Sequence, residues 1–178
     1  LGDDPLKDFV IDGLKDSGIK LDAIIDPTRP TINKNVVIAE GYRLLKIDTL
    51  DNRPVSESIL EKLIQSITNS SADGVAFCDF RHGIFTRMSV PLLTKAIPPN
   101  IFCVADSQVA SRWGNITEFK GFDLITPNER ESRFALADQD SNIGGLSGLL
   151  HERAENKNLI LQLGERGVFC SVKDKDQT

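Results

Sequence analysis

The stretch GVAFCD at residues 74–79 decides the fold of this chain, because five small or apolar residues run without interruption into Asp79. A strand with no polar face is expected in a parallel sheet that is covered on both sides. The same pattern returns at 101–106, where the apolar run IFCVA precedes Asp106. Residues 88–97 between the two runs form a predicted helix, with Pro91 near its start. A strand, a helix and a second strand in this order predict two parallel strands joined by a crossover.

Outward from this unit, the alternation of strands and helices continues in both directions. Upstream, Ser56 is the predicted N-cap of a helix with apolar residues at helical spacing, and Asp4-Pro5 opens another helix that Gly18 ends. Downstream, the predicted elements are strands at 122–126, 158–163 and 168–172 and helices at 128–137 and 146–154. Several parallel strands joined by helices predict an α/β fold with a doubly wound, mostly parallel sheet.

Residues 23–48 interrupt this alternation, because they contain strand candidates with no helix between them. The candidates lie at 23–25, 35–39 and 43–48, and Glu40-Gly41 joins the last two as a hairpin turn. This segment predicts a small antiparallel sheet that is distinct from the main one. The predicted organisation is a core formed by residues 1–22 and 49–178, with residues 23–48 as a separate β segment.

The composition is that of an ordinary globular protein, with 40% hydrophobic and 26% charged residues among 178. A net charge of -5 gives little attraction for a phosphate backbone, so we expect no nucleic-acid partner. Apolar runs stay well short of the roughly 18 residues of a membrane helix, so we expect no membrane partner. The three cysteines, Cys78, Cys103 and Cys170, lie in apolar runs without C-x-x-C spacing. They predict buried free thiols in a reducing compartment and favour the cytoplasm.

Polar groups and glycines follow the predicted strands, at the edge where ligands bind in open α/β sheets. Asp79 follows one strand, Asp106 the next, Asn128 the third, and Gly164-x-x-Gly167 a fourth. Each has a purely structural alternative. Aspartates are common in turns, Asn128 with Glu131 fits a helix capping box, and the two glycines fit a hairpin turn. Taken singly, the capping box and the hairpin are the simpler interpretations.

Together, these strand ends have the residue types of a nucleotide phosphate and magnesium site. The free N–H groups of a helix N-terminus attract an anion, and glycines let a nucleotide approach the backbone closely. The carboxylate of Glu131 can hold a metal ion or its bound water, and Asn128 can add a neutral contact. We therefore predict Asn128, Glu131, Gly164 and Gly167 as nucleotide-site residues, with Glu131 and Asn128 on the metal.

These motifs resemble those of the ribokinase-type (PfkB) carbohydrate kinases. Thr126-Pro127-Asn128-x-x-Glu131 resembles their N-x-x-E motif, and Leu163-Gly164-Glu165-Arg166-Gly167 resembles their nucleotide-side glycine turn. Asp79-Phe80-x-x-Gly83 resembles the end of their S-D-Y-x-K-G strand. Arg29-Pro30-Thr31-x-x-Lys34, followed by Leu44-Leu45-Lys46-Ile47-Asp48, resembles their substrate lid, and Gly2-Asp3-Asp4 the segment before the first lid-linked helix. The motifs occur in the family's order across nearly the whole chain, most similar to the heptose-phosphate kinase branch, the kinase half of ADP-heptose synthases.

The resemblance implies a ribokinase-like α/β fold with residues 23–48 as a β lid. It implies phosphoryl transfer from ATP, with Mg²⁺, to a hydroxyl of a sugar or sugar phosphate. By resemblance, Asn128 and Glu131 organise magnesium and phosphates, Gly164 and Gly167 line the nucleotide, and Thr31, Lys34 and Asp79 belong to the substrate and lid side. The family's lid often pairs with a second subunit, which allows a homodimer through the lid.

The family's catalytic base lies in a G-A-G-D-like motif that these 178 residues lack. We therefore expect no catalytic base within the chain, and expect it downstream of Thr178. The chain begins at Leu1 and ends in the polar run 173–178, and both ends resemble cuts. The expectation is a truncated fragment, inactive by itself, without the N-terminal sugar-binding and C-terminal catalytic segments.

The sequence departs from the family pattern near the phosphates. His82 stands in place of a lysine, Asp106-Ser107-Gln108-Val109 replaces a D-P-K-G strand end, and Gln162 replaces a threonine. Arg81 and Arg112 are candidates to replace the lost positive charge. The departures favour an alternative, a non-catalytic nucleotide- or sugar-binding relative. A third alternative, an unrelated flavodoxin-like binding module, leaves residues 23–48 unexplained. His151 is expected to face solvent.

Overall fold

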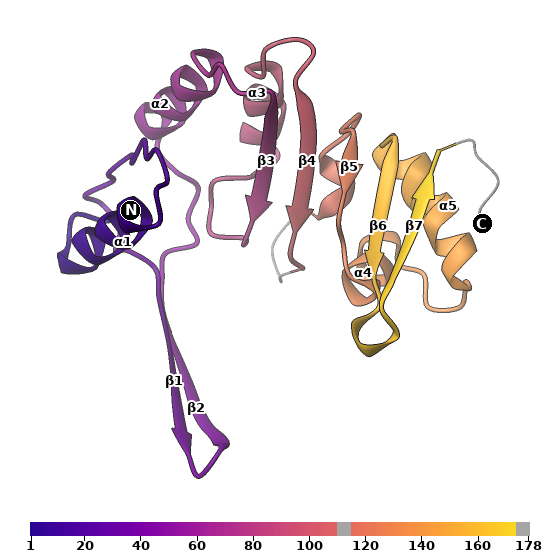
Figure 1. The fold of residues 1–178 in the computed structure, drawn as a ribbon, viewed down its shortest axis with the longest axis horizontal. Coiled ribbons are helices and arrows are strands. Elements are labelled where there is room, and N and C mark those ends of the chain that lie inside the picture. The colour runs from indigo at the N-terminus through magenta and orange to yellow at the C-terminus, as the bar shows by residue number, and fades with distance from the viewer. Residues whose placement is uncertain (110–114, 174–178) are drawn as a thin grey trace.

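The computed structural model describes residues 1–109 and 115–173 and confirms a mostly parallel α/β sheet (Figure 1). The sheet has five strands in the order β3-β4-β5-β6-β7. These are β3 (Gly74–Asp79), β4 (Phe102–Ser107), β5 (Leu124–Ile125), β6 (Asn158–Gln162) and β7 (Val168–Val172). The first four run parallel, and β7 pairs antiparallel with β6. The carboxyl ends of β3 to β6 therefore lie along one edge.

Most of the helices begin where a polar side chain satisfies a free backbone N–H group. Asp4 caps α1 (Pro5–Asp16), Ser56 caps α2 (Glu57–Thr68) and Asn128 caps α4 (Glu129–Leu136), as predicted. The predicted helix at 88–97 is α3 (Ser89–Lys95). The last helix, α5 (Ile143–Ala154), begins three residues earlier than expected, because Asn142 caps it and the helix tolerates Gly144-Gly145.

One face of the sheet packs against the helices and forms the core. Phe77, Ala105, Ile125 and Leu159 point to this face, where side chains of α2, α3, α4 and α5 join them in one cluster. Four phenylalanines fill its centre with ring centroids 5.2–6.3 Å apart: Phe77, Phe85, Phe119 and Phe122. Tilted and edge-on ring contacts of this kind add to the energy of apolar burial.

Two expectations about burial are wrong. Strand β3 alternates, so that Phe77 and Asp79 are buried whereas Ala76 and Cys78 are exposed. Cys170 is exposed as well, and Cys103 is only partly buried. The physical reason is that a strand sends neighbouring side chains to opposite faces, and the helices pack against the face to which Phe77 points.

The predicted hairpin is present as β1 (Asn33–Ala39) and β2 (Tyr42–Thr49), which form a separate two-stranded antiparallel sheet. It projects away from the rest of the chain (Figure 1). Glu40 and Gly41 form its turn, with φ values of 49° and 82°, as a tight hairpin requires. Its apolar side chains are exposed, with Ile38 63% and Tyr42 73% accessible.

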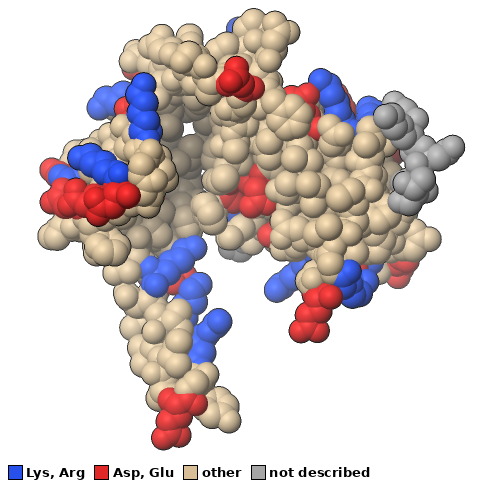
Figure 2. All heavy atoms as spheres, viewed as in Figure 1, with Lys and Arg blue, Asp and Glu red and all other residues tan. Residues whose placement is uncertain are grey.

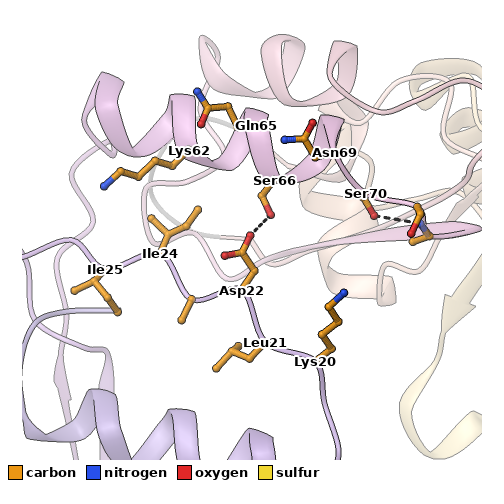
Figure 3. A pocket seen from close by; sticks show the side chains of 13 residues that line it. Lys20, Leu21, Asp22, Ile24, Ile25, Lys62, Gln65, Ser66, Asn69 and Ser70 are labelled. Carbon is orange, nitrogen blue, oxygen red and sulfur yellow. Dashed lines mark hydrogen bonds between the residues drawn. The ribbon is translucent and has the colours of Figure 1, made fainter.

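The strand expected at 23–25 is absent from the described chain. Residues 20–25 instead run alongside α2, where Asp22 accepts a hydrogen bond of 2.5 Å from Ser66. An open groove of about 990 Å³ lies between them, lined by residues such as Lys20, Ile24 and Gln65 (Figure 3). Apolar β-branched residues are not sufficient for a strand, which also needs a neighbour to complete its hydrogen bonds. Among the described residues, no helix has the length and apolar character to cross a membrane.

Candidate functional site

The carboxyl ends of the parallel strands are joined to one another by polar contacts. Ser107 Oγ, at the end of β4, donates to Asp79 Oδ2 at the end of β3 over 3.0 Å. Thr126 Oγ1, after β5, donates to Asp106 Oδ1 over 3.1 Å. Gln162 Nε2, at the end of β6, donates to the Thr126 backbone oxygen over 2.8 Å. The sheet thus places side chains from four separate sequence segments along a single polar edge.

The motif that holds Asn128 and Glu131 is a complete capping box. Asn128 Oδ1 accepts from the Glu131 backbone N–H, and Glu131 Oε2 accepts from the Asn128 backbone N–H, each over 2.8 Å. The interpretation of these two residues as a helix capping box is therefore confirmed. The capping box still leaves a lone pair on both side-chain oxygens, because an amide or carboxylate oxygen can accept more than one hydrogen bond or metal contact.

Glu131 lies in surroundings that disfavour its negative charge. Burial raises the pKa of its carboxyl group above the ordinary value, and repulsion from Asp106 adds to the rise, partly offset by the hydrogen bond from the Asn128 N–H. Neighbouring carboxylates such as Glu131 and Asp106 suit a divalent cation, whose positive charge would offset the repulsion between them. The oxygen donors of Glu131, Asp106 and Asn128 fit Mg²⁺ in kind. Within residues 1–109 and 115–173, no group of three or more His, Cys, Asp and Glu residues is arranged to enclose a metal.

The glycine turn is a hairpin loop between β6 and β7, as its structural alternative predicts. Gly164 and Gly167 have positive φ values of 63° and 89° and flank a short 3-10 turn. Leu163 N–H donates to the Gly167 oxygen over 2.9 Å, which closes the loop. Positive φ values favour glycine, which has no side chain to cover the backbone. The loop therefore presents bare backbone beside the start of α4.

An open cavity of about 680 Å³ lies between this loop and α4. Asn128 and Gly164 both line it, together with Gln162, which bridges β6 to the start of α4. Glu131 and Gly167 are not among its lining residues. The structure therefore brings together two of the four predicted nucleotide-site residues and places the other two just beyond them.

Glu129 and two arginines form a charged group beside this cavity that the sequence analysis missed. Glu129 Oε1 pairs with Arg133 over 2.8 Å, and Glu129 Oε2 pairs with Arg166 of the glycine loop. The Arg133 guanidinium lowers the pKa of the Glu129 carboxyl group, and Arg166 reinforces the effect. The i,i+4 spacing of Glu129 and Arg133 was a usable signal. The contact of Glu129 with Arg166 had no signal in the sequence, because it depends on how the loop between β6 and β7 lies against α4.

Asp79 is held inside the protein and is not open to a ligand. It is 3% exposed and accepts hydrogen bonds from the Arg81 N–H over 2.7 Å and from Ser107. Its carboxylate also pairs with the Arg81 guanidinium, whose side chain is 7% exposed. Its predicted place on the substrate side stays a prediction. Arg81 is committed to this pair, and Arg112 lies outside the described residues.

The two lid residues differ in accessibility. Thr31 is buried at the base of the hairpin, where its Oγ1 accepts from Gly2 N–H over 2.9 Å and its N–H donates to Asp4 Oδ2 over 2.7 Å. Lys34, on β1, places its Nζ 5.9 Å from the centre of the Phe80 ring in the loop after β3. Figure 2 shows basic side chains along the hairpin and acidic ones near the ends of β3 and β4.

The histidines both differ from surface residues. His82 is partly buried, which lowers its pKa, and its Nδ1 lies 3.0 Å from Asn52 Oδ1. The expectation that His151 faces solvent is wrong. It is buried between α5 and β7, with Nε2 2.8 Å from Ser171 Oγ and Nδ1 3.2 Å from the Asn156 oxygen. The position follows from the buried face of α5, on which His151 lies four residues after Ser147 and three before Ala154.

Gly83 is required by close backbone contact. It has a φ of +90°, and a Cβ there would lie 2.0 Å from the Arg53 oxygen. We expect Gly83→Ala to lower the free energy of unfolding by about 1–3 kcal/mol, as measured by urea denaturation. Gly121→Ala is the matched control, since its φ is +74° but a Cβ there has nothing within 4 Å. Equal losses for the two variants would show that contact with Arg53 is unimportant.

Comparison with known proteins matches the whole chain to one family. A model of the pfkB family carbohydrate kinases matches residues 1–178. The Bifunctional protein HldE of Helicobacter pylori (strain ATCC 700392 / 26695) is 25% identical over 175 residues, covering 94% of this chain and 37% of the relative. HldE of Wolinella succinogenes is 23% identical over 164 residues, covering 88% and 32%. The chain thus spans about a third of the length of these relatives.

Solved structures share the fold. Ribokinase from Giardia lamblia superposes with a TM-score of 0.77 at 18% identity, over 98% of this chain and 58% of its own. Phosphofructokinase-2 from Escherichia coli, in complex with fructose-6-phosphate, superposes with a TM-score of 0.72 at 15% identity, over 99% and 59%. The ribokinase-like fold implied by the sequence motifs is therefore confirmed. The chain belongs to the pfkB family of carbohydrate kinases.

Proposed function

We propose that the protein containing these residues transfers a phosphoryl group from ATP, with Mg²⁺, to a hydroxyl of a sugar or sugar phosphate. The observation that carries this proposal is the shared cavity beside α4. Asn128, at the N-terminus of α4, and Gly164, in the loop after β6, line it together although they are far apart in sequence. A helix N-terminus next to an exposed glycine backbone suits a nucleotide phosphate.

The residues at this edge have distinct proposed roles. The N–H groups at the start of α4 and the Gly164 backbone hold phosphate oxygens, and Glu131 and Asn128 hold the metal. Arg166 adds positive charge beside the cavity, where it pairs with the lining residue Glu129. Bound Mg²⁺ would offset the charge on the phosphates. Two lysines of the family pattern are replaced by His82 and Gln108, so more of the charge balance falls on the metal and on arginine.

The hairpin β1–β2 is the proposed lid, with Thr31 and Lys34 on the acceptor side. Closure over the acceptor would keep water away from the transferred phosphoryl group. The exposed apolar residues of the hairpin, such as Ile38 and Tyr42, support a homodimer through the lid. The catalytic base is proposed to lie outside residues 1–178. The acidic charge and the free cysteines favour a cytoplasmic protein without nucleic-acid or membrane partners.

A second candidate is a relative that binds nucleotide or sugar without chemistry. The observation that favours it is the ion pair of Arg81 with Asp79. Because Arg81 neutralises this carboxylate, it does not supply the positive charge of the family lysine that His82 replaces. A binding-only protein would retain nucleotide affinity but give no turnover.

The test uses the longest natural chain that contains these residues. It is incubated with ATP and Mg²⁺ and a panel of sugars and sugar phosphates, and acceptor-dependent ADP release and the phosphorylated product are measured. Product formation on at least one acceptor supports the kinase. ATP binding by calorimetry without turnover on any acceptor supports the binding-only relative. Absence of both nucleotide binding and turnover contradicts the assignment of the cavity.

A further inference from the structure

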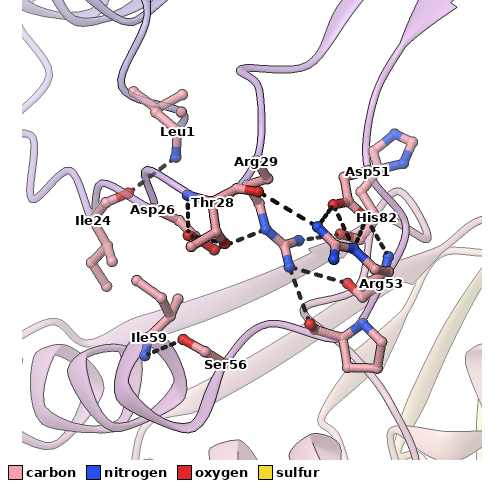
Figure 4. A network of polar contacts seen from close by, with 12 residues as sticks. Leu1, Ile24, Asp26, Thr28, Arg29, Asp51, Arg53, Ser56, Ile59 and His82 are labelled. Carbon is pink, nitrogen blue, oxygen red and sulfur yellow. Dashed lines mark hydrogen bonds and ion pairs between the residues drawn. The ribbon is translucent and has the colours of Figure 1, made fainter.

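Arg29 is the centre of a polar network at the base of the hairpin (Figure 4). Its side chain is 13% exposed and pairs with Asp26 over 2.8 Å. It also donates to three backbone oxygens: Arg53 over 3.2 Å, Pro54 over 3.1 Å and His82 over 3.4 Å. A single guanidinium therefore satisfies acceptors from two segments that are distant in sequence from its own.

The three acceptor oxygens lie in the segments that flank the hairpin and in the loop after β3. Arg29 precedes the start of β1 at Asn33, and Arg53 and Pro54 follow the end of β2 at Thr49. His82 belongs to the loop after β3, two residues beyond Phe80, over whose ring Lys34 of the hairpin lies. Arg29 thus ties both strands of the hairpin, at their base, to the loop that follows Asp79.

The pair with Asp26 keeps Arg29 in place. Asp26 is 4% exposed. Hydrogen bonds from Thr28 lower the pKa of the Asp26 carboxyl group, and Arg29 lowers it further. The carboxylate is therefore charged at neutral pH and orients the guanidinium toward the three oxygens. Lysine would keep the charge, but it has no planar fork with which to reach several acceptors at once.

We propose that Arg29 is a positioning residue that fixes the orientation of the hairpin over the loop at residues 79–83. It acts through the backbone and has no assigned contact with nucleotide or acceptor. Its catalytic consequence rests on the proposed function, because the orientation matters for turnover only if the hairpin is a lid. Its structural consequence, a hairpin base held against the loop after β3, is independent of activity.

The test compares Arg29→Met and Arg29→Lys with the control Arg53→Met in the longest natural chain. Arg53 is the control because its side chain is 70% exposed, its pair with Asp51 is local, and its hydrogen bond to the Thr28 oxygen at the hairpin base is long, at 3.5 Å. Hydrogen exchange is measured at the hairpin base, in residues 26–35 and 46–55, and in β4 and β6. We expect about tenfold faster exchange at the base in both Arg29 variants, unchanged exchange in β4 and β6, and little change in Arg53→Met.

Kinetics supply the second readout. We expect the KM for the acceptor to rise about tenfold in Arg29→Met, with the KM for ATP within about twofold and more ATP hydrolysis without acceptor. Exchange that rises equally in β4 and β6 would show a merely structural role and overturn the proposal. So would unchanged exchange at the hairpin base. If the wild-type chain phosphorylates no acceptor but exchange changes at the base alone, the proposed function fails while the positioning role stands.

Discussion

Glu131→Gln is expected to lower turnover by about 10²–10³-fold while leaving the melting temperature within a few degrees of wild type. Glutamine has the same shape and can still accept the hydrogen bond from the Asn128 N–H, which measures 2.8 Å, so the capping box is kept. The substitution removes only the charge, which is the property that a divalent cation needs. Steady-state kinetics and thermal unfolding of the longest natural chain make the comparison.

The pH dependence of stability gives an independent check on Glu131. Its pKa in the folded chain is raised by burial above the ordinary 4.5. The folded state therefore binds the proton more tightly than the unfolded state does. This contribution to stability is present below pH 4.5 and is lost as the pH rises through the folded-state pKa. Glutamine does not titrate, so Glu131→Gln should gain stability relative to wild type as the pH rises through that window.

Asn128→Ala is the matched variant for the structural role of the same motif. It removes the side chain that accepts the Glu131 N–H, and loss of such a cap costs about 1 kcal/mol of stability. If Glu131→Gln instead kept normal turnover and melted at a clearly lower temperature, Glu131 would be a capping residue and nothing more. Turnover of the Glu131→Gln and Asn128→Ala variants is also measured as a function of Mg²⁺ concentration. Turnover that recovers at high Mg²⁺ shows weakened metal binding, and turnover that stays low shows a slower chemical step.

Asp79→Ala is expected to lower the free energy of unfolding by about 3–5 kcal/mol, because it leaves the Arg81 charge buried without its carboxylate. The two side chains are 1% and 7% exposed. Ser107 also loses the acceptor of its hydrogen bond. Chemical denaturation followed by circular dichroism measures the loss.

Two controls interpret the Asp79 result. The double variant Asp79→Ala/Arg81→Met should recover part of the lost stability, since it removes the buried charge that has lost its Asp79 partner. Glu155→Ala breaks an exposed pair with Lys120, whose side chains are 55% and 63% accessible, and should leave stability unchanged within error. A loss below about 1 kcal/mol for Asp79→Ala, with a raised acceptor KM, would favour a direct role on the substrate side.

The sequence by itself determined most of the helices and strands and their order, and the strand expected at 23–25 is the exception. Helix starts at Asp4, Ser56 and Asn128 followed from local capping chemistry, and the turn at Glu40-Gly41 followed from backbone conformation. Helix caps and tight turns both depend on residues within a few positions of one another, so they can be predicted from the sequence. The family followed for the same reason, because its motifs are short and occur in order.

Only the tertiary structure decided which strand-end residues meet and which are buried. Three contacts join positions that have no regular spacing in sequence. They are the cavity lined by Asn128 and Gly164, the ion pair of Glu129 with Arg166, and the hydrogen bond from Arg29 to the His82 oxygen. The burial of Asp79 and His151 and the exposure of Cys78 depend on which face of a strand or helix meets the core. The physical reason is that hydrogen bonding and charge pairing act over a few ångströms in space, whereas sequence patterns record only neighbours along the chain.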